Sequence, residues 1–439
     1  MGKKEEKLEE LRRLLKRRGP ISTQEILKEL SITQPTFSRM ASNFSDLLAI
    51  GDGRSRLYGL SRTQESYPLI KIGERAEVFA LGELRLLEPR GAAFIPQKKS
   101  SLKAEVYSDV PFFIWDVRPQ GYLGKIFVSQ HPELKLPDRW EDWQESDLYR
   151  TLKVRGDDLV GNLVIGHESF EQFQSSEPTP LKKIQREVEY PKLADAALQG
   201  AHAGSSAGGE QPKFTTAIQN EKDISHVIVK FSPPTDTDLG RRWANLLFAE
   251  NVALKLLLEN GYEAARSEVF ECNSRVFLEV TRFDRVGRKG RKGMLSLGVV
   301  DDEYVGERSS WTKTAIRLLD LKLIKKQDAE AIVFLDCFGT CIANTDRHFG
   351  NLSMFWEFGK SKFSLAPVYD MLPMAYAPVQ GNIVEREYKS PVVQFEQLHV
   401  WESAKKLGIE FWHKLSNDDR VSNNFKEISR TNLNILKST

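Results

Sequence analysis

The sequence contains few cysteines and no long apolar run. Its three cysteines in 439 residues are an odd number, which does not fit a framework of disulfides. Cys337 and Cys341 lie one helical turn apart without a second pair of metal-ligating residues, so we expect buried thiols in a reducing compartment. No apolar run approaches the roughly 20 residues of a membrane-spanning helix, and the N-terminus lacks the apolar core of a secretion signal. These absences predict a cytoplasmic protein without a membrane partner.

The sequence also has little net charge, but this charge is unevenly distributed. The chain carries a formal charge of +2, with 28% charged and 40% hydrophobic residues, which is ordinary for a globular protein of about two to four domains. Residues 1–62 contain 13 basic and 8 acidic side chains, whereas the remainder contains 50 and 53. A basic N-terminal segment favours binding to nucleic acid, although a solvated helix surface would have the same composition.

Residues 1–62 show the pattern of a winged helix-turn-helix domain. Leucines at helical spacing predict a helix over residues 5–18. Ser22 and Glu25 have the spacing of a capping box at the start of a second helix, and Pro35 suits the first turn of a third. Two short apolar strands around a Gly-Asp-Gly turn complete the predicted order of elements.

The third predicted helix has small and polar side chains where a DNA-reading helix presents them. The residues expected to reach base edges are Gln34, Thr36, Ser38 and Arg39. Arg54 and Arg56, at the turn between the two strands, are expected to meet phosphate or the minor groove. A winged helix that binds protein or forms a dimer has the same elements. The polar character of the third helix favours DNA.

The next stretch carries no motif that indicates chemistry. Residues 61–66 form a polar linker, and short apolar runs over residues 67–170 predict a mostly antiparallel sheet, including the apolar stretch 112–127. The Arg-Gly-Asp tripeptide at 155–157 does not by itself indicate a function in a cytoplasmic chain. Residues 175–200 are predicted to be helical.

Two elements that follow are typical of nucleotide binding. A loop rich in glycine around residues 204–209, with Lys213 after it, can hold phosphates through its backbone N–H groups, although a plain loop would have the same composition. Lys230 lies at the end of a predicted strand, and Glu250 lies in the helix that follows. A Lys–Glu pair between strand and helix is the usual phosphate-holding arrangement of kinases.

The segment from residue 344 to 370 contains the residues with the clearest chemistry. Asp346 and Asn351 are five positions apart, as in the D-x-x-x-x-N of a kinase catalytic loop, and Asp370 follows a predicted hairpin. An Asp can accept the proton of an attacking hydroxyl. An Asn oxygen and a second carboxylate suit Mg²⁺, which prefers oxygen ligands. A surface loop with solvated carboxylates is the alternative, and the complete set favours function.

These motifs, in this order, resemble the HipA family of bacterial serine/threonine kinases, the toxins of HipBA-type toxin–antitoxin pairs. The string from Thr345 to Asn351 matches the family's TDxHxxN core, and Tyr369 and Asp370 match its downstream Tyr-Asp pair. The resemblance covers roughly residues 70–439, and the fused N-terminal domain is similar to the YjjJ-type branch. It implies an α+β, two-lobed, protein-kinase-like fold. The expected domains are a winged helix-turn-helix over 1–62, a β-rich lobe over 67–285 and a mainly helical lobe over 286–439.

The resemblance also implies roles for individual residues. Asp346 would be the catalytic base, Asn351 and Asp370 would hold Mg²⁺, and backbone groups at Thr281 and Phe283 would meet adenine, with Thr281 standing where the family has Glu. The residues expected to contact ATP are Ala207, Gly208, Gly209, Lys213, Lys230, Glu250, Thr281, Phe283, His348, Asn351, Tyr369 and Asp370. Ser205, by its match to the family's Ser-x-Ala-Gly, or else Ser206, would be autophosphorylated, which would eject the loop and inactivate the kinase.

The implied function is an ATP- and Mg²⁺-dependent protein kinase that acts on a translation component such as an aminoacyl-tRNA synthetase. DNA, through the N-terminal domain, and a HipB-like antitoxin are the expected partners. One alternative is a DNA-binding transcriptional regulator whose kinase-like body only senses nucleotide; the complete set of Lys, Asp, Asn and second Asp counts against it. Another is a Mg²⁺-dependent nuclease, which would have no need for the Gly-rich loop and the strand Lys.

Overall fold

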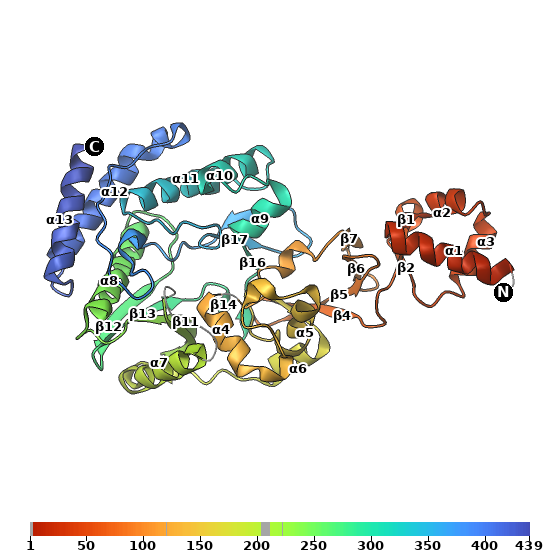
Figure 1. Ribbon diagram of the computed structural model, residues 1–439, viewed down its shortest axis with the longest axis horizontal. Coiled ribbons are helices and arrows are strands. Elements are labelled where there is room, and N and C mark those ends of the chain that lie inside the picture. The colour runs from red at the N-terminus through yellow and green to blue at the C-terminus, as the bar shows by residue number, and fades with distance from the viewer. Residues whose placement is uncertain (1–2, 120, 203–210, 222) are drawn as a thin grey trace.

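The computed structural model describes residues 3–119, 121–202, 211–221 and 223–439. Figure 1 shows the N-terminal elements at one end of the molecule and the C-terminal helices at the other, with the sheets of the central region between them. None of the helices within these described ranges has the length and apolarity needed to cross a membrane.

The N-terminal elements follow the predicted order, and their helices enclose a small core of leucines and Phe37. They are α1 (Lys3–Arg18), β1 (Ile21–Ser22), α2 (Thr23–Glu29), α3 (Gln34–Ala41), β2 (Leu47–Ile50), the 3₁₀ turn η1 (Gly53–Ser55) and β3 (Leu57–Leu60), with the sheet order β1-β3-β2. The predicted capping box is confirmed, because Glu25 N donates to Ser22 Oγ at 3.3 Å and Ser22 N donates to the Glu25 carboxylate at 2.9 Å.

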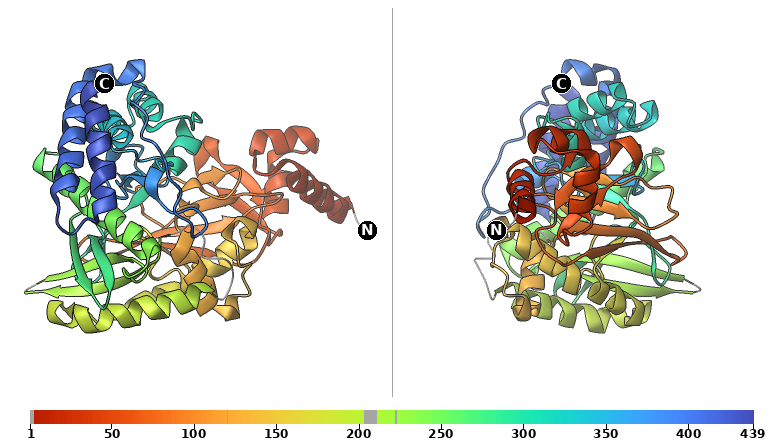
Figure 2. Two further views of the ribbon diagram at one scale, coloured as in Figure 1. Left: turned by 60° about the vertical axis from the view of Figure 1, so that its left-hand side comes forward. Right: turned by 90° about the vertical axis from the view of Figure 1, so that its right-hand side faces the viewer.

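The N-terminal elements are joined to the next part of the chain by contacts as well as by the chain itself. Ile50 packs against Leu87 and Ala93, and Arg62, in the predicted linker 61–66, forms an ion pair with Glu145 at 2.8 Å. The linker is therefore fixed along its start. Figure 2 shows the N-terminal elements projecting beside the strands that follow them.

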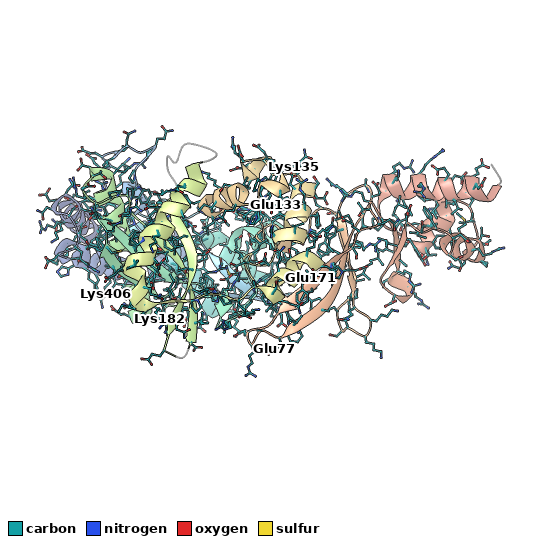
Figure 3. All side chains as sticks on the ribbon, turned by 90° about the horizontal axis from the view of Figure 1, so that it is seen from below. Glu77, Glu133, Lys135, Glu171, Lys182 and Lys406 are labelled. Carbon is teal, nitrogen blue, oxygen red and sulfur yellow. The ribbon has the colours of Figure 1, made fainter. Side chains whose placement is uncertain are left out.

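The middle part of the chain is an antiparallel five-stranded sheet with three helices. The strands are β4 (Tyr67–Ile72), β5 (Val78–Leu86), β6 (Ala92–Pro96), β7 (Glu105–Tyr107) and β8 (Leu163–Ile165), in the order β7-β6-β5-β4-β8. The helices are α4 (Gly121–Gln130), α5 (Glu145–Arg155) and α6 (His167–Ser175), with 3₁₀ turns η2 (Phe112–Ile114), η3 (Pro132–Leu134) and η4 (Trp140–Asp142). Charged side chains such as Glu133, Lys135 and Glu171 cover its outer surface (Figure 3).

The prediction of strands over residues 112–127 is wrong. This stretch forms η2 and most of α4. Phe113 and Ile114 are buried as they would be in a strand, at 1% and 0% exposure. Short apolar runs have no period that separates a buried strand from a buried helix, so the sequence pattern was ambiguous here.

A second five-stranded sheet follows, and helices cover both of its faces. Its strands are β9 (Leu181–Lys182), β10 (Lys213–Asn220), β11 (Asp223–Phe231), β12 (Ser267–Cys272) and β13 (Arg275–Thr281), in the order β12-β13-β11-β10-β9. The helices are α7 (Arg186–His202), preceded by η5 (Lys183–Gln185), and α8 (Asp238–Glu259). Figure 1 shows α7 and α8 on opposite sides of these strands. Val229 and Phe231 pack toward α7, so the alternation of a strand turns Lys230 toward α8.

The C-terminal part is mainly helical, as predicted. It contains β14 (Arg285–Val286), β15 (Gly290–Arg291), β16 (Met294–Ser296), α9 (Leu297–Tyr304), α10 (Trp311–Asp320), α11 (Lys326–Cys341), β17 (Ser353–Trp356), β18 (Phe363–Leu365), η6 (Met374–Tyr376), η7 (Phe395–Gln397), α12 (Leu398–Asn417) and α13 (Asn423–Ser438). Cys337 and Cys341 are buried free thiols, so the expected burial of these two side chains is confirmed. The predicted hairpin between Asn351 and Asp370 is the pair β17–β18.

Candidate active site

Three charged side chains from distant parts of the chain meet in the interior. The Lys230 ammonium group donates to both carboxylate oxygens of Glu250, each at 2.6 Å, and also to the carboxylate of Asp370. Lys230 comes from β11, Glu250 from α8, and Asp370 from the loop after β18. The side chains of Lys230 and Glu250 are 5% and 0% exposed. The predicted Lys–Glu pair is thus present and extends to a third residue.

The electrostatics of this group depend on its burial. Burial alone would lower the pKa of Lys230, but the charges of Asp370 and Glu250 outweigh it and raise that pKa. Burial would likewise raise the pKa of Asp370, but the charges of Lys230 and Lys213 lower it. For Glu250, burial dominates and raises the pKa despite the contact with Lys230. Two carboxylates therefore share one ammonium group, and Asp370 is the more firmly ionised of the two.

Lys213 lies beside this group. It is paired with Lys230 in the antiparallel register of β10 and β11, so both side chains project from the same face of the sheet. Its charge lowers the pKa of Asp370 and acts in the same direction on Glu250 and Asp346. Lys213 is partly buried, and its ammonium group forms no ion pair with any of the residues that the structure describes.

The catalytic loop predicted around Asp346 is built on its own hydrogen bonds. Asp346 N donates to Asn344 Oδ1 at 3.1 Å, and Asn351 Nδ2 donates to the carbonyl of Asp346 at 2.7 Å. Asn344 Nδ2 also donates to the carbonyl of Asp370 at 3.3 Å, which ties the loop to the second carboxylate. Burial raises the pKa of Asp346, the charge of nearby Asp370 raises it further, and His348 opposes both.

The backbone around these residues adopts unusual conformations. Asp370 has a φ of 53° and Ala343 a φ of 58°, a left-handed region that residues other than glycine rarely occupy. Such conformations persist where the surroundings enforce them, and they concentrate at functional sites. Here they lie on both sides of the catalytic loop.

A buried carboxylate that the sequence analysis did not identify supports the catalytic loop. Asp336, in α11, accepts from Arg347 Nε at 3.0 Å, from Thr312 Oγ1 at 2.7 Å and from Gln397 Nε2 at 3.3 Å. Arg347 in turn donates to the carbonyl of Asn344. The available signal was one acidic residue inside the apolar run of α11.

The backbone N–H groups of Thr281 and Phe283, the two residues expected at adenine, differ in their hydrogen bonding. Thr281 N donates to the carbonyl of Arg266 at 2.9 Å, so this N–H is not free for adenine, and a contact between adenine and the Thr281 carbonyl stays a prediction. Within the described residues, no acceptor is bonded to the N–H of Phe283. The Phe283 ring lies 5.8 Å from that of Tyr369, whose hydroxyl donates to the carbonyl of Gly350 at 2.7 Å. Phe283 and Tyr369 therefore border the site together.

The donor set fits Mg²⁺. Asn351 uses Nδ2 for the carbonyl of Asp346, which leaves its amide oxygen as the open end of the side chain. This oxygen and the ionised carboxylate of Asp370 are hard ligands of the kind that Mg²⁺ prefers. Across the described ranges there is no cluster of three or more His, Cys, Asp or Glu side chains able to hold a metal. A site of one carboxylate and one amide would leave most positions on the metal to phosphate oxygens and water.

Other predicted residues lie elsewhere or outside the described residues. Ser205, Ser206, Ala207, Gly208 and Gly209 lie outside them. His348 is exposed, and its Nδ1 accepts from Gly350 N at 3.1 Å. A cavity of about 780 Å³ lies between β4 and the β17–β18 hairpin, where Lys71, Lys292 and Glu357 contribute to its lining. None of the predicted residues lines it.

The residues predicted to meet DNA are on the surface of the N-terminal elements. On α3, Gln34, Ser38 and Arg39 are exposed and Thr36 is partly exposed, while Phe37 faces the core. At the turn between β2 and β3, Arg54 is exposed. Arg56 donates to the carbonyl of Gly51 at 3.2 Å and is 3.5 Å from the carboxylate of Asp52. The solvent-facing side of α3 and the turn are thus both available to a partner.

Comparison with known proteins gives consistent results. Residues 63–174 match the family described as "YjjJ-like toxin, middle domain", and residues 205–432 match the "HipA-like C-terminal domain". The chain is 33% identical over 421 residues to the toxin YjjJ of Escherichia coli strain K12, which covers 94% of each protein.

One solved structure shares the fold of the chain. A HipA from Shewanella oneidensis MR-1, solved in complex with HipB and its operator DNA, matches with a TM-score of 0.55 at 14% identity, over 85% of this chain and 97% of that chain. The kinase CtkA of Helicobacter pylori gives a TM-score of 0.35 at 14% identity, over 53% of this chain and 90% of that chain, a likeness too weak to carry an argument. The mixed α+β architecture is therefore that of HipA.

Proposed function

The chain belongs to the HipA-like toxin family, in the branch of toxin YjjJ, and on this basis we propose that it is an ATP- and Mg²⁺-dependent serine/threonine protein kinase. The observation that carries the proposal is the meeting of Lys230, Glu250 and Asp370. A strand lysine paired with a helix glutamate, next to a metal-binding aspartate, is the arrangement with which kinases hold nucleotide phosphates.

Each residue has a definite part in this chemistry. Lys230 and Lys213 are cations on one face of the sheet, suited to hold the phosphates of ATP. Asp346 is the base that accepts the proton of the substrate hydroxyl, and its raised pKa brings it closer to the working pH, where a base is most effective. Asn351 and Asp370 would hold Mg²⁺, which, when bound, neutralises charge on the transferring phosphate.

The exposed surface beyond the site supports a protein substrate. Of the fourteen large apolar side chains that are exposed in the described ranges, six lie between residues 379 and 398. Phe395 is 84% exposed, and Gln397, two residues later, is bonded to the same Asp336 that holds the catalytic loop. Six exposed apolar side chains within one stretch of the chain are a candidate surface for contact with a protein substrate. A translation component such as an aminoacyl-tRNA synthetase remains the substrate that the family resemblance implies.

We extend the proposal to two partners. DNA would be bound by α3 and the β2–β3 turn, because both are exposed and carry arginines. A HipB-like antitoxin is the second partner, since the HipA of Shewanella oneidensis was solved with HipB and operator DNA. A DNA-binding regulator that only senses nucleotide is the competing function, and the intact set of catalytic residues disfavours it.

One experiment separates the competing functions. The purified protein is incubated with Mg²⁺, γ-labelled ATP and a DNA fragment, and label is followed in protein, in free phosphate and on DNA, together with the length of the DNA. A kinase transfers label to protein. Nucleotide binding without transfer would indicate a sensor, and DNA cleavage without transfer would indicate a nuclease; either result overturns the proposal.

A further inference from the structure

The loop of residues 156–162, in the middle part of the chain, contacts the segment that follows β13. Arg285 donates through Nη2 to the carbonyl of Leu159 at 2.6 Å and to the carboxylate of Asp158 at 2.9 Å, and through Nη1 to the carbonyl of Gly161 at 3.1 Å. The Arg285 side chain is 3% exposed. One buried guanidinium therefore binds three groups of a loop more than a hundred residues earlier in the sequence.

The carboxylate of Asp284 also joins the segment after β13 to the loop of residues 156–162. Its carboxylate accepts from Gly161 N at 3.2 Å and from Arg285 Nη1 at 2.6 Å, and it receives a two-pronged contact from Arg282 Nε and Nη2, both at 3.0 Å. Burial would raise the pKa of Asp284, but the charges of Arg282 and Arg285 outweigh it and lower that pKa. The carboxylate is therefore ionised at neutral pH, and each of its contacts is charge-assisted.

The following hairpin, β14–β15, also contacts the middle part of the chain. Arg291 donates to the carbonyl of Asp157, lies 4.8 Å over the ring of Phe173, and uses its backbone N–H for the carbonyl of Gly73 at 3.0 Å. A Cβ on Gly290 would come within 1.9 Å of the carbonyl of Glu74, so only glycine fits there. The Arg-Gly-Asp tripeptide at 155–157 thus belongs to an internal contact.

This contact borders the proposed adenine site. Phe283, whose N–H has no acceptor within the described residues, lies between Arg282 and Asp284. Arg282 N donates to the carbonyl of His226 in β11 at 2.8 Å, and its side chain is bonded to Asp284. The chain on both sides of the free N–H is thereby fixed, on one side by the sheet and on the other by the loop of residues 156–162.

We propose that the middle part of the chain sets the affinity for nucleotide by fixing the hinge segment, residues 281–285, through Asp158, Asp284 and Arg285. Asp158 and Arg285 are positioning residues: they hold the Phe283 N–H where the adenine of ATP meets it. This inference rests on the proposed nucleotide site. It predicts that weakening the contact between Arg285 and the loop of residues 156–162 lowers the affinity for adenine. The affinity for phosphate should stay unchanged, because Lys230 and Lys213 lie on β11 and β10, outside that contact.

The test compares Arg285→Lys and Asp158→Asn with a matched control. Lysine keeps the charge but cannot bind Leu159 and Gly161 with a fork. The control is Asp195→Asn. Asp195 is 59% exposed and pairs with Arg275 at 2.9 Å, at the opposite end of β13. It resembles Asp158, which is 66% exposed and pairs with Arg285 at the same distance. Binding of a non-hydrolysable ATP analogue with Mg²⁺ is measured by calorimetry, with competition by adenosine and by tripolyphosphate.

Arg285→Lys should lower the affinity for the ATP analogue and for adenosine about tenfold, which is the effect of one or two lost hydrogen bonds. The affinity for tripolyphosphate should not change. Asp158→Asn should lower the affinity for the ATP analogue and for adenosine about threefold, and Asp195→Asn should bind them like wild type. In turnover, KM for ATP should rise while kcat stays constant. Equal affinities in wild type, Arg285→Lys and Asp158→Asn would overturn the positioning role alone. A wild type that binds no analogue would overturn the nucleotide site itself.

Discussion

Lys230 and Asp370 are 140 positions apart in the sequence, yet the ammonium group of the first contacts the carboxylate of the second. Glu250 accepts from the same ammonium group, so one cation joins a strand, a helix and the loop that follows the β17–β18 hairpin. The contact brings the residue proposed to hold phosphate next to the residue proposed to bind the metal. It also makes the stability of the interior depend on residues that we assign to chemistry.

We expect Lys230→Met to abolish phosphoryl transfer and to lower the free energy of unfolding by about 3–5 kcal/mol, because it leaves the buried carboxylate of Glu250 without its cation. Urea unfolding at neutral pH measures the loss. Adding Glu250→Leu to this variant should restore most of the stability without restoring activity.

Lys71→Met is the matched control for that loss. Lys71 is 2.9 Å from Glu357, but the glutamate is 56% exposed, so removal of this pair should cost less than about 1 kcal/mol. Equal losses for Lys71→Met and Lys230→Met would contradict the account of the buried pair.

Asp370→Ala and Asn351→Ala should each reduce activity through the metal. Both remove an oxygen ligand, so the Mg²⁺ concentration needed for half-maximal transfer should rise by about tenfold or more. High Mg²⁺ or Mn²⁺ should restore part of the activity. A titration of the transfer rate against each metal provides the measurement, and an unchanged metal dependence in both variants would refute the ligand assignment.

Arg39→Ala, and separately Arg54→Ala with Arg56→Ala, should weaken DNA binding and leave phosphoryl transfer intact. Each lost phosphate contact should reduce the slope of log K against log salt by roughly 0.9. Arg13→Ala is the control, because Arg13 is a 78%-exposed arginine of α1 outside the predicted surface. If wild type binds no DNA at low salt, the N-terminal elements serve another purpose.

Protein expressed alone should carry phosphate on Ser205 or Ser206. A phosphate adds about −1.5 to −2 charges, and the family resemblance implies that this modification inactivates the kinase. Mass spectrometry of the intact loop decides the matter, with the Asp346→Asn protein as the unphosphorylated reference. An unmodified loop in an otherwise active enzyme would exclude this form of self-inhibition.

The sequence predicted the parts of the site whose geometry follows from local rules. The spacing of Asp346 and Asn351 sets one short loop, and strand alternation turns Lys230 toward the helix that carries Glu250. The contact between Arg285 and Asp158 joins residues 127 positions apart, which no local pattern brings together. The role of Asp336 depends on three separate elements, and the loss of the Thr281 N–H depends on Arg266 lying beside it.

The central claim is that Asp346 acts on a substrate hydroxyl in a kinase, and comparison of wild type with Asp346→Asn tests it most directly. With γ-labelled ATP and Mg²⁺, wild type should transfer label to protein. In the variant, the rate of transfer should fall by a factor of about 10³ or more, which corresponds to about 4 kcal/mol in the barrier. Its affinity for the ATP analogue should be nearly unchanged, because the substitution removes a base and no phosphate contact. A variant that transfers label at the wild-type rate would contradict the account.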